Sequence, residues 1–412
     1  MNNVFIEELP CGSVLIFEED KRVSTVDISF LVKTGSIDEE PSINGIAHFI
    51  EHLLFKGTKK RTNREISEEI ELKGGSIDAF TSTEYTCFYT HLLSEDYLTG
   101  IDLLQDLIFN PAFREEDFEN EKKVIIQEVK SYFDSPENLL IKYHSERLFG
   151  KENPISFPIE GTIKSVSSLK LEQLKRYWEK FYTPDNIIIT CIGNIKYDDI
   201  KKSLSIPQMN ERIKRERTFK EIRRDKKNLK CIYKNSLEQV YVAISNTGFP
   251  YNDKRRYTLL ILMSILGQGM SSYLFMKMRE ENALVYTIFT YVNQFQNTGE
   301  YGIFLATDEK NINNTLFTLK DALKNFNVDE ELLIKTKTKI SKGYKLEFQN
   351  TGRRAGWYQR EFFYTGNIIS MDEFIKNIND VKIKDVMDLY EEFFDTNKFM
   401  ITTLGRVRNV KW

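Results

Sequence analysis

The chain has 412 residues, which is long for one hydrophobic core, so two or more domains are expected. Its 61 acidic and 58 basic residues nearly balance, and this argues against a broad nucleic-acid or anionic-membrane surface. No stretch approaches the roughly 20 apolar residues of a membrane span. The start, MNNVFIEELPCGS, does not resemble a signal peptide, and the four cysteines are widely spaced. A cytoplasmic location with free thiols is therefore expected.

The first third of the chain mixes strand and helix patterns. Two stretches rich in β-branched and aromatic residues, Val23–Gly35 and Gly74–Leu92, predict strands. Apolar spacings of three and four predict helices over Asn63–Gly75, Asp96–Phe109 and Glu116–Phe133. This mixture predicts an α+β fold, a sandwich built from a mixed sheet with helices on one face.

Between these elements, the stretch GIAHFIEHLLFKGT (Gly45 to Thr58) contains two of the chain's four histidines. On a helical wheel its isoleucines, leucines and phenylalanine at position 49 form one stripe, and His48, Glu51 and His52 lie opposite. Histidines four residues apart stack on one face and can grip a single ion. Two imidazoles suit zinc, and Glu51 is placed to take a proton from water held by the metal. The alternative is a surface helix with a chance pairing of histidines.

The second half of the chain repeats part of the first. The segment Leu169–Ile195 aligns without a gap with Val381–Val407, 212 residues later, and each copy predicts a helix, a turn and a strand that ends in glycine. At the same offset, His48, Glu51 and His52 align with Leu260, Met263 and Ser264, none of which forms a metal site of this kind. We therefore expect two similar α/β-sandwich halves related by internal duplication, with the metal in the first half alone.

Three regions follow from the repeat. Residues 1–210 are expected to form a zinc-bearing catalytic half, and residues 231–412 a duplicated half without metal. Between them, residues 211–230 are dense in charge and nearly free of apolar side chains, which is typical of a solvated linker.

The His-x-x-Glu-His motif is the common zinc-protease signature, His-Glu-x-x-His, in reverse order. With it, the chain resembles the inverted-motif zinc proteases, the family of pitrilysin, insulin-degrading enzyme and mitochondrial processing peptidase, and among them the short two-domain bacterial members. The resemblance implies that a glutamate 76 residues beyond the second histidine is the third metal ligand, and Glu128 stands there. It also implies a second glutamate near the site, and Glu121 matches it.

Two further segments resemble parts of the same family. The family's substrate strand usually reads Gly-Gly-x-x-Asn-Ala-x-Thr, and the chain has GGSIDAFT, so the resemblance implies substrate contacts on the strand residues Asp78, Ala79, Phe80 and Thr81. Asp78 replaces the usual asparagine, which puts a carboxamide contact in doubt. In the second half, Arg279 and Tyr286 match the family's arginine and tyrosine seven residues apart, which implies that they bind the substrate carbonyl.

The expected function is that of a zinc-dependent endopeptidase with one Zn²⁺ per chain. It would cleave peptides, unfolded segments or presequences in a closed chamber formed by a dimer. The resemblance implies a homodimer, in which Arg279 and Tyr286 reach the partner's zinc, and leaves open a heterodimer with a partner that lacks the motif. A non-catalytic scaffold subunit and a metal-binding regulator without hydrolysis are two competing hypotheses. Bulk peptide clearance, presequence removal and leader-peptide trimming all require the same zinc site.

Overall fold

The structure is a computed structural model that describes residues 4–208, 215 and 217–412. The chain forms two compact units, and each is described by itself. Unit 1 comprises the residues up to Ser131, Phe157–Thr218 and Glu347–Ile368. Unit 2 comprises Tyr132–Ser156, Phe219–Leu346 and Ile369–Trp412. Unit 1 therefore includes one segment from the second half of the sequence, and unit 2 includes one segment from the first half.

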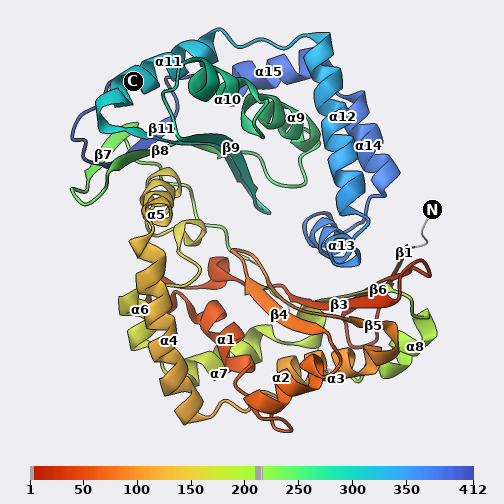
Figure 1. The fold of residues 1–412 in the computed structure, drawn as a ribbon. Helices are drawn as coiled ribbons and strands as arrows, with labels where there is room; N and C mark the ends of the chain where they lie inside the picture. The colour runs from red at the N-terminus through yellow and green to blue at the C-terminus, as the bar shows by residue number, and fades with distance from the viewer. Residues whose placement is uncertain (1–3, 209–214, 216) are drawn as a thin grey trace. The chain divides into compact units, whose positions relative to one another are not determined.

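Unit 1 contains a six-stranded mixed sheet (Figure 1). Its strands are β1 (Val4–Glu8), β2 (Val14–Glu19), β3 (Thr25–Val32), β4 (Ser76–Thr81), β5 (Thr86–Leu93) and β6 (Ile187–Gly193). They lie in the order β1-β2-β6-β3-β5-β4, and all neighbouring pairs are antiparallel except β2 with β6. The strand β4 is thus at one edge of the sheet.

Helices cover both faces of this sheet. The helices of the unit are α1 (Ile46–Leu54), α2 (Asn63–Glu71), α3 (Tyr97–Phe109), most of α4 (Glu115–Asp134), α6 (Ile163–Ser168), α7 (Leu171–Phe181), α8 (Tyr197–Ser203) and α13 (Thr351–Thr365). Gly100 of α3 lies against Leu92 on one face, whereas Gln359 of α13 contacts Cys87 on the opposite face. The expectation of helices on one face therefore omitted α13.

The helix α13 explains the burial of the central strand. All seven residues of β6 are buried, as expected for a strand covered on both sides. Figure 1 shows α13 in blue beside β6 and β3, although they lie far apart in the sequence. Arg354 fixes this helix through ion pairs with Asp20 (2.5 Å) and Glu18 (3.4 Å).

Unit 2 repeats this architecture around a five-stranded mixed sheet. Its strands are β7 (Leu229–Tyr233), β8 (Gln239–Gly248), β9 (Thr287–Gln294), β10 (Gly299–Asp308) and β11 (Met400–Gly405), in the order β7-β11-β8-β10-β9 with β7 parallel to β11. Its helices are α5 (Pro136–Phe149), α9 (Arg256–Gly267), α10 (Tyr273–Phe275), α11 (Ile312–Lys324), α12 (Glu330–Glu347), α14 (Met371–Asp380) and α15 (Ile383–Phe393). Leu140 of α5 packs against Ala243, Phe304 and Leu404 of the sheet.

The predicted duplication and mixed fold class are confirmed. Helix α15 begins and ends 212 residues after α7, and the strands β6 and β11 that follow them occupy matching places in the two sheets. The two strand orders agree except for the additional edge strand β1. A single boundary at residues 211–230 does not separate the two units. Helix α5, from the first half of the sequence, packs on the second sheet, and α13, from the second half, packs on the first sheet.

The charged segment expected as a linker is only partly described, since residues 211–214 and 216 lie outside the described residues. Two of its arginines are not solvated. Arg215 pairs with Asp185 at 3.0 Å and Arg217 with Asp38 at 2.9 Å, and both arginine side chains are about 15% exposed. Among the helices described, none combines the length and apolarity that a membrane span requires.

Candidate metal site

Helix α1 carries the histidine motif on the face that its core residues do not use. The helix begins after Gly45, whose φ of +94° is accessible mainly to glycine. The predicted apolar stripe is buried and consists of Ile46, Phe49, Ile50, Leu53 and Leu54. His48 and His52 lie on the other face, and their ring centroids are 4.5 Å apart. The 3.6-residue period therefore places the packing residues and the motif residues on different faces of one nine-residue helix.

His48, His52 and Glu128 come together from two helices. One ligand atom from each lies within 4.8 Å of the other two, and this is the one group of its kind in the described part of the chain. Nε2 of His52 is 3.5 Å from a carboxylate oxygen of Glu128, on α4. Two imidazoles and one carboxylate form a typical three-ligand set for catalytic zinc.

The environment of the two histidines fits a dication. Nδ1 of His48 is buried and has no hydrogen-bond partner among the described residues, so it is available as a ligand atom. Burial and the neighbouring His52 lower the pKa of His48 to about 3, which keeps the ring neutral, as metal binding requires. Burial opposes protonation of His52, but Glu121, Glu128 and Glu51 outweigh it and raise its pKa. The cluster of carboxylates thus supplies negative charge around the two rings.

Glu121 lies seven residues before Glu128 on the same face of α4, behind His52. One of its oxygens is 2.9 Å from Nδ1 of His52, and the other pairs with Lys56 at 2.6 Å. Burial opposes ionisation, but the hydrogen bonds from His52 and Lys56 lower the pKa of Glu121. The Nδ1–H of His52 therefore donates to a carboxylate, an arrangement that orients a histidine ligand. Lys56 was not predicted from the sequence; its only signal is its position four residues after His52.

Glu51 lies between the two histidines in the sequence and is held by the predicted substrate strand. The hydroxyl of Thr81 donates to Glu51 at 2.6 Å. Burial is the main cause that raises the pKa of Glu51, and Asp78 and Glu128 add to it. A carboxylate with a raised pKa is suited to proton transfer near neutral pH.

The four predicted strand residues, Asp78 to Thr81, lie on the edge strand β4, which pairs with β5. Asp78 and Phe80 are exposed on one face of the strand, whereas Thr81 faces α1 through its bond to Glu51. Tyr89 donates to Asp78 at 3.3 Å. An edge strand of this kind can add a peptide as a further strand.

Arg279 and Tyr286 belong to unit 2, so the structure does not bring them together with the histidines within one unit. Arg279 lies in a π-helical segment, Met276–Glu281, with its guanidinium over the ring of Phe275. Tyr286 is 55% exposed, and its hydroxyl is 3.5 Å from Asp308. π-helical turns are frequent at functional sites, and the roles of both residues remain predictions.

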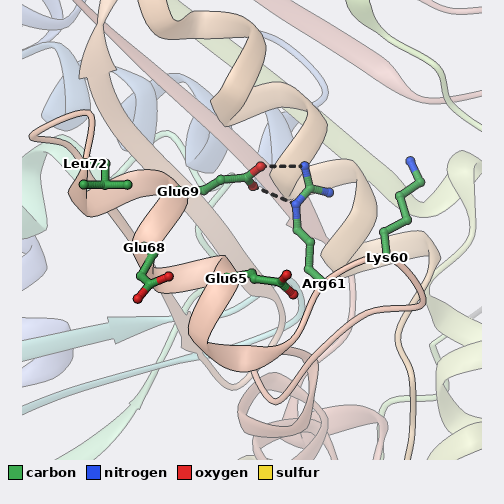
Figure 2. Close-up of a pocket in the computed structure, with 6 residues that line it drawn as sticks. All are labelled: Lys60, Arg61, Glu65, Glu68, Glu69 and Leu72. Atoms are coloured by element: carbon green, nitrogen blue, oxygen red, sulfur yellow. Dashed lines mark hydrogen bonds and ion pairs between the residues drawn. The ribbon is translucent and has the colours of Figure 1, made fainter.

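A separate shallow pocket lies beside α2, lined by Lys60, Arg61, Glu65, Glu68, Glu69 and Leu72 (Figure 2). Figure 2 shows Arg61 turned toward Glu69, to which it is bonded at 2.7 Å. Arg61 also pairs with Asp102 and Asp106 on α3. These pairs join α2 to α3, and none of the residues that line the pocket belongs to the histidine cluster.

Comparisons with known proteins agree with this fold and identify a family. Residues 14–162 match the family Insulinase (Peptidase family M16), and residues 168–339 match the peptidase M16 inactive domain. The uncharacterized zinc protease YmxG of Bacillus subtilis is 30% identical over 386 residues, which cover 93% of this chain and 94% of that protein. The chain belongs to peptidase family M16.

Solved structures share the fold along almost the whole chain. A protease from Helicobacter pylori superposes with a TM-score of 0.91 at 19% identity and covers 98% of this chain and 99% of that one. A chain of the complex III₂ from Candida albicans superposes with a TM-score of 0.84 at 16% identity, and covers 98% and 96%. At these identities the likeness concerns the fold alone.

Proposed function

We propose that this protein is a zinc-dependent endopeptidase that hydrolyses peptides or unfolded segments. The observation that carries the proposal is the group of His48, His52 and Glu128, with the carboxylate of Glu51 on the same helix as the histidines. Curated relatives named zinc proteases support the class of reaction. The inverted motif supports the choice of residues.

In this proposal His48, His52 and Glu128 hold one Zn²⁺ per chain. When bound, the ion would polarise the scissile carbonyl and lower the pKa of a coordinated water to about 7. Three protein ligands leave a position open, which distinguishes a catalytic from a structural zinc site.

Glu51 acts as the general base and then as the proton donor. Its carboxylate takes a proton from the attacking water and delivers it to the amine that leaves when the amide C–N bond breaks. The hydroxyl of Thr81 holds one oxygen of Glu51 in place. Glu121 positions His52 through its bond to Nδ1.

The substrate is proposed to pair with β4 through main-chain hydrogen bonds, alongside Asp78, Ala79, Phe80 and Thr81. Arg279 and Tyr286 are proposed to bind the carbonyl oxygen as charge develops on it. A homodimer, in which Arg279 and Tyr286 act at the partner's zinc, would form the closed chamber. A heterodimer with a partner that lacks the motif is the alternative arrangement. The cytoplasmic location expected from the sequence is proposed as well.

A non-catalytic scaffold subunit is the second candidate, because a chain of the complex III₂ from Candida albicans shares this fold. The intact group of His48, His52 and Glu128 favours the enzyme, since a scaffold has no need of a neutral buried histidine beside two carboxylates. The zinc content of the purified protein separates the two candidates.

The deciding experiment is a digest of a peptide library by the zinc-loaded protein, read by mass spectrometry, with Glu51→Gln as the blank. General acid–base catalysis contributes about 10²–10⁴-fold, so the variant should lose that much of kcat while it still binds zinc. Wild-type cleavage rates in Glu51→Gln would refute the role of Glu51. An inert, zinc-loaded wild type would favour the metal-binding regulator, and a zinc-free, inert protein the scaffold.

A further inference from the structure

Helix α1 begins without a capping side chain of its own. Its N-cap residue is Gly45, which has no side chain to accept a hydrogen bond from the first turn. The first N–H groups of any helix have no partner within the helix, and they need one when the helix start is buried. Gly45, Ile46 and Ala47 are all buried.

Glu39 supplies the missing acceptors from the preceding loop. Its Oε2 accepts from the backbone N–H of Gly45 (2.8 Å) and from Nδ2 of Asn44 (2.8 Å). Its Oε1 accepts from the backbone N–H of Ala47 at 2.9 Å. The side chain is 3% exposed, so both oxygens are fully engaged within the protein. Burial raises the pKa of Glu39 to about 8, whereas the three N–H donors lower it, so these bonds favour the ionised form, which the helix dipole also stabilises.

The same end of α1 also packs closely against the loop before α6. A Cβ atom on Gly45 would lie 2.8 Å from the carbonyl oxygen of Glu160, and one on Gly161 would lie 2.5 Å from that of Asn44. Nδ2 of Asn44 also donates to the carbonyl of Pro158 at 2.9 Å. The start of α1 is therefore fixed by close backbone packing on one side and by Glu39 on the other.

The bonds made by Glu39 end one residue before the first histidine, since Ala47 precedes His48. Glu128 comes from α4, so the distance between the histidines and their carboxylate partner depends on how α1 sits along and around its axis. We infer that Glu39 is a positioning residue for the metal site, which sets His48 and His52 opposite Glu128 by capping α1. The inference rests on the proposed zinc site of the same helix.

The isosteric variant Glu39→Gln separates this role from simple packing. Glu39 uses two acceptor oxygens, whereas glutamine offers one and would turn an NH₂ group toward a backbone or amide donor. Glu39→Asp keeps both acceptors on a side chain that is shorter by one methylene. It serves as the second variant if Glu39→Gln does not fold.

The test measures Zn²⁺ affinity by competition with a chromogenic chelator, at a temperature where each variant is folded. Loss of an outer-shell contact typically weakens metal binding about 10–100-fold, and we expect this for Glu39→Gln, with Glu39→Asp in between. Leu104→Val, in the core on α3, is the control for lost stability. It should bind Zn²⁺ as the wild type does, even where its melting temperature falls as far.

Visible absorption of the Co²⁺-loaded protein gives an independent reading, because the bands report ligand geometry and should shift in Glu39→Gln but not in Leu104→Val. Wild-type zinc affinity and an unchanged cobalt spectrum in Glu39→Gln would overturn the inference and leave Glu39 as a stabilising cap only. Peptide cleavage by the wild type is judged separately. A wild type that binds Zn²⁺ but cuts nothing refutes the proposed function and leaves this inference standing.

Discussion

The Nδ1–H of His52 donates to a carboxylate oxygen of Glu121 at 2.9 Å, and Lys56 holds the other oxygen at 2.6 Å. This contact fixes the tautomer of His52 with its proton on Nδ1 and leaves Nε2 facing Glu128. Only 4% of the Glu121 side chain is exposed, so solvent cannot readily replace it. In the proposed zinc site, Glu121 would therefore orient the ligand His52 without being a ligand itself.

Replacement of Glu121 should weaken the metal site without removing a ligand. We expect Glu121→Gln to lower Zn²⁺ affinity about 10–100-fold, because a neutral amide no longer orients the imidazole or adds to its basicity. Equilibrium titration against a chelator measures the change. Glu119→Gln, an exposed carboxylate on the same helix that pairs with Lys122, is the matched control and should have no effect. Equal affinities for the two variants would contradict the role of Glu121.

Thr81→Val should slow the reaction and leave zinc binding unchanged. The substitution removes the hydroxyl that donates to Glu51 at 2.6 Å and nearly preserves the side-chain shape. A hydrogen bond to a charged group contributes about 1.5–3 kcal/mol, so kcat should fall about 10–100-fold. Steady-state kinetics on one peptide, with Thr83→Val as the control, provides the measurement. A change confined to KM would instead assign Thr81 to substrate binding.

The sequence predicted those parts of the molecule whose residues carry a local pattern. The period of three and four separated the buried stripe of α1 from His48 and His52, and the repeat predicted α7 and α15 with matching ends. The placement of α5 in unit 2 and of α13 in unit 1 was not predictable, because a local sequence pattern does not indicate which sheet a helix covers. The mostly apolar sequence of β6 was compatible with helices on both faces of the strand, but it did not identify α13 as the second helix.

The residues that support the candidate metal site were missed for a related reason. Glu39 bonds to the start of α1 and Lys56 pairs with Glu121, and charged residues near a helix are common without such contacts. The candidate ligands have a fixed spacing along the chain, whereas the residues that support them are defined by distances in space. Helix ends with no side-chain cap, such as Gly45, are where such support is needed.

Removal of the guanidinium of Arg354 should destabilise unit 1. Its side chain is 4% exposed and pairs with Asp20 and Glu18, which are themselves buried. Loss of one partner from a buried ion pair costs about 3–5 kcal/mol, because the remaining charge stays in a poorly solvating interior. Arg354→Met should therefore lower the midpoint of urea unfolding markedly, and the exposed neighbour Arg353→Met is the control. Equal midpoints would show that packing alone holds α13 in place.

The buried His144 should make the stability of unit 2 depend on pH. Its two ring nitrogens contact Thr402 (2.8 Å) and Ser245 (2.6 Å) on two strands of the sheet. Burial is the main cause that lowers its pKa to about 3, with Arg147 and Arg224 adding to it. The unfolded chain takes up a proton near pH 6.5, whereas the folded chain does not until about pH 3, so the contribution of His144 to stability is complete above pH 6.5 and falls as the pH drops through this window.

The size of the effect follows from the same linkage. Where one more proton is bound in the unfolded state, the free energy of unfolding falls by about 1.4 kcal/mol for each pH unit. Urea unfolding between pH 7 and pH 5 should therefore give a steeper pH dependence for the wild type than for His144→Gln, which keeps one donor and one acceptor but cannot titrate. Thr402→Val leaves His144 in place and should retain the steep dependence. Parallel curves for wild type and His144→Gln would mean that the pKa of His144 is the same in the folded and the unfolded chain.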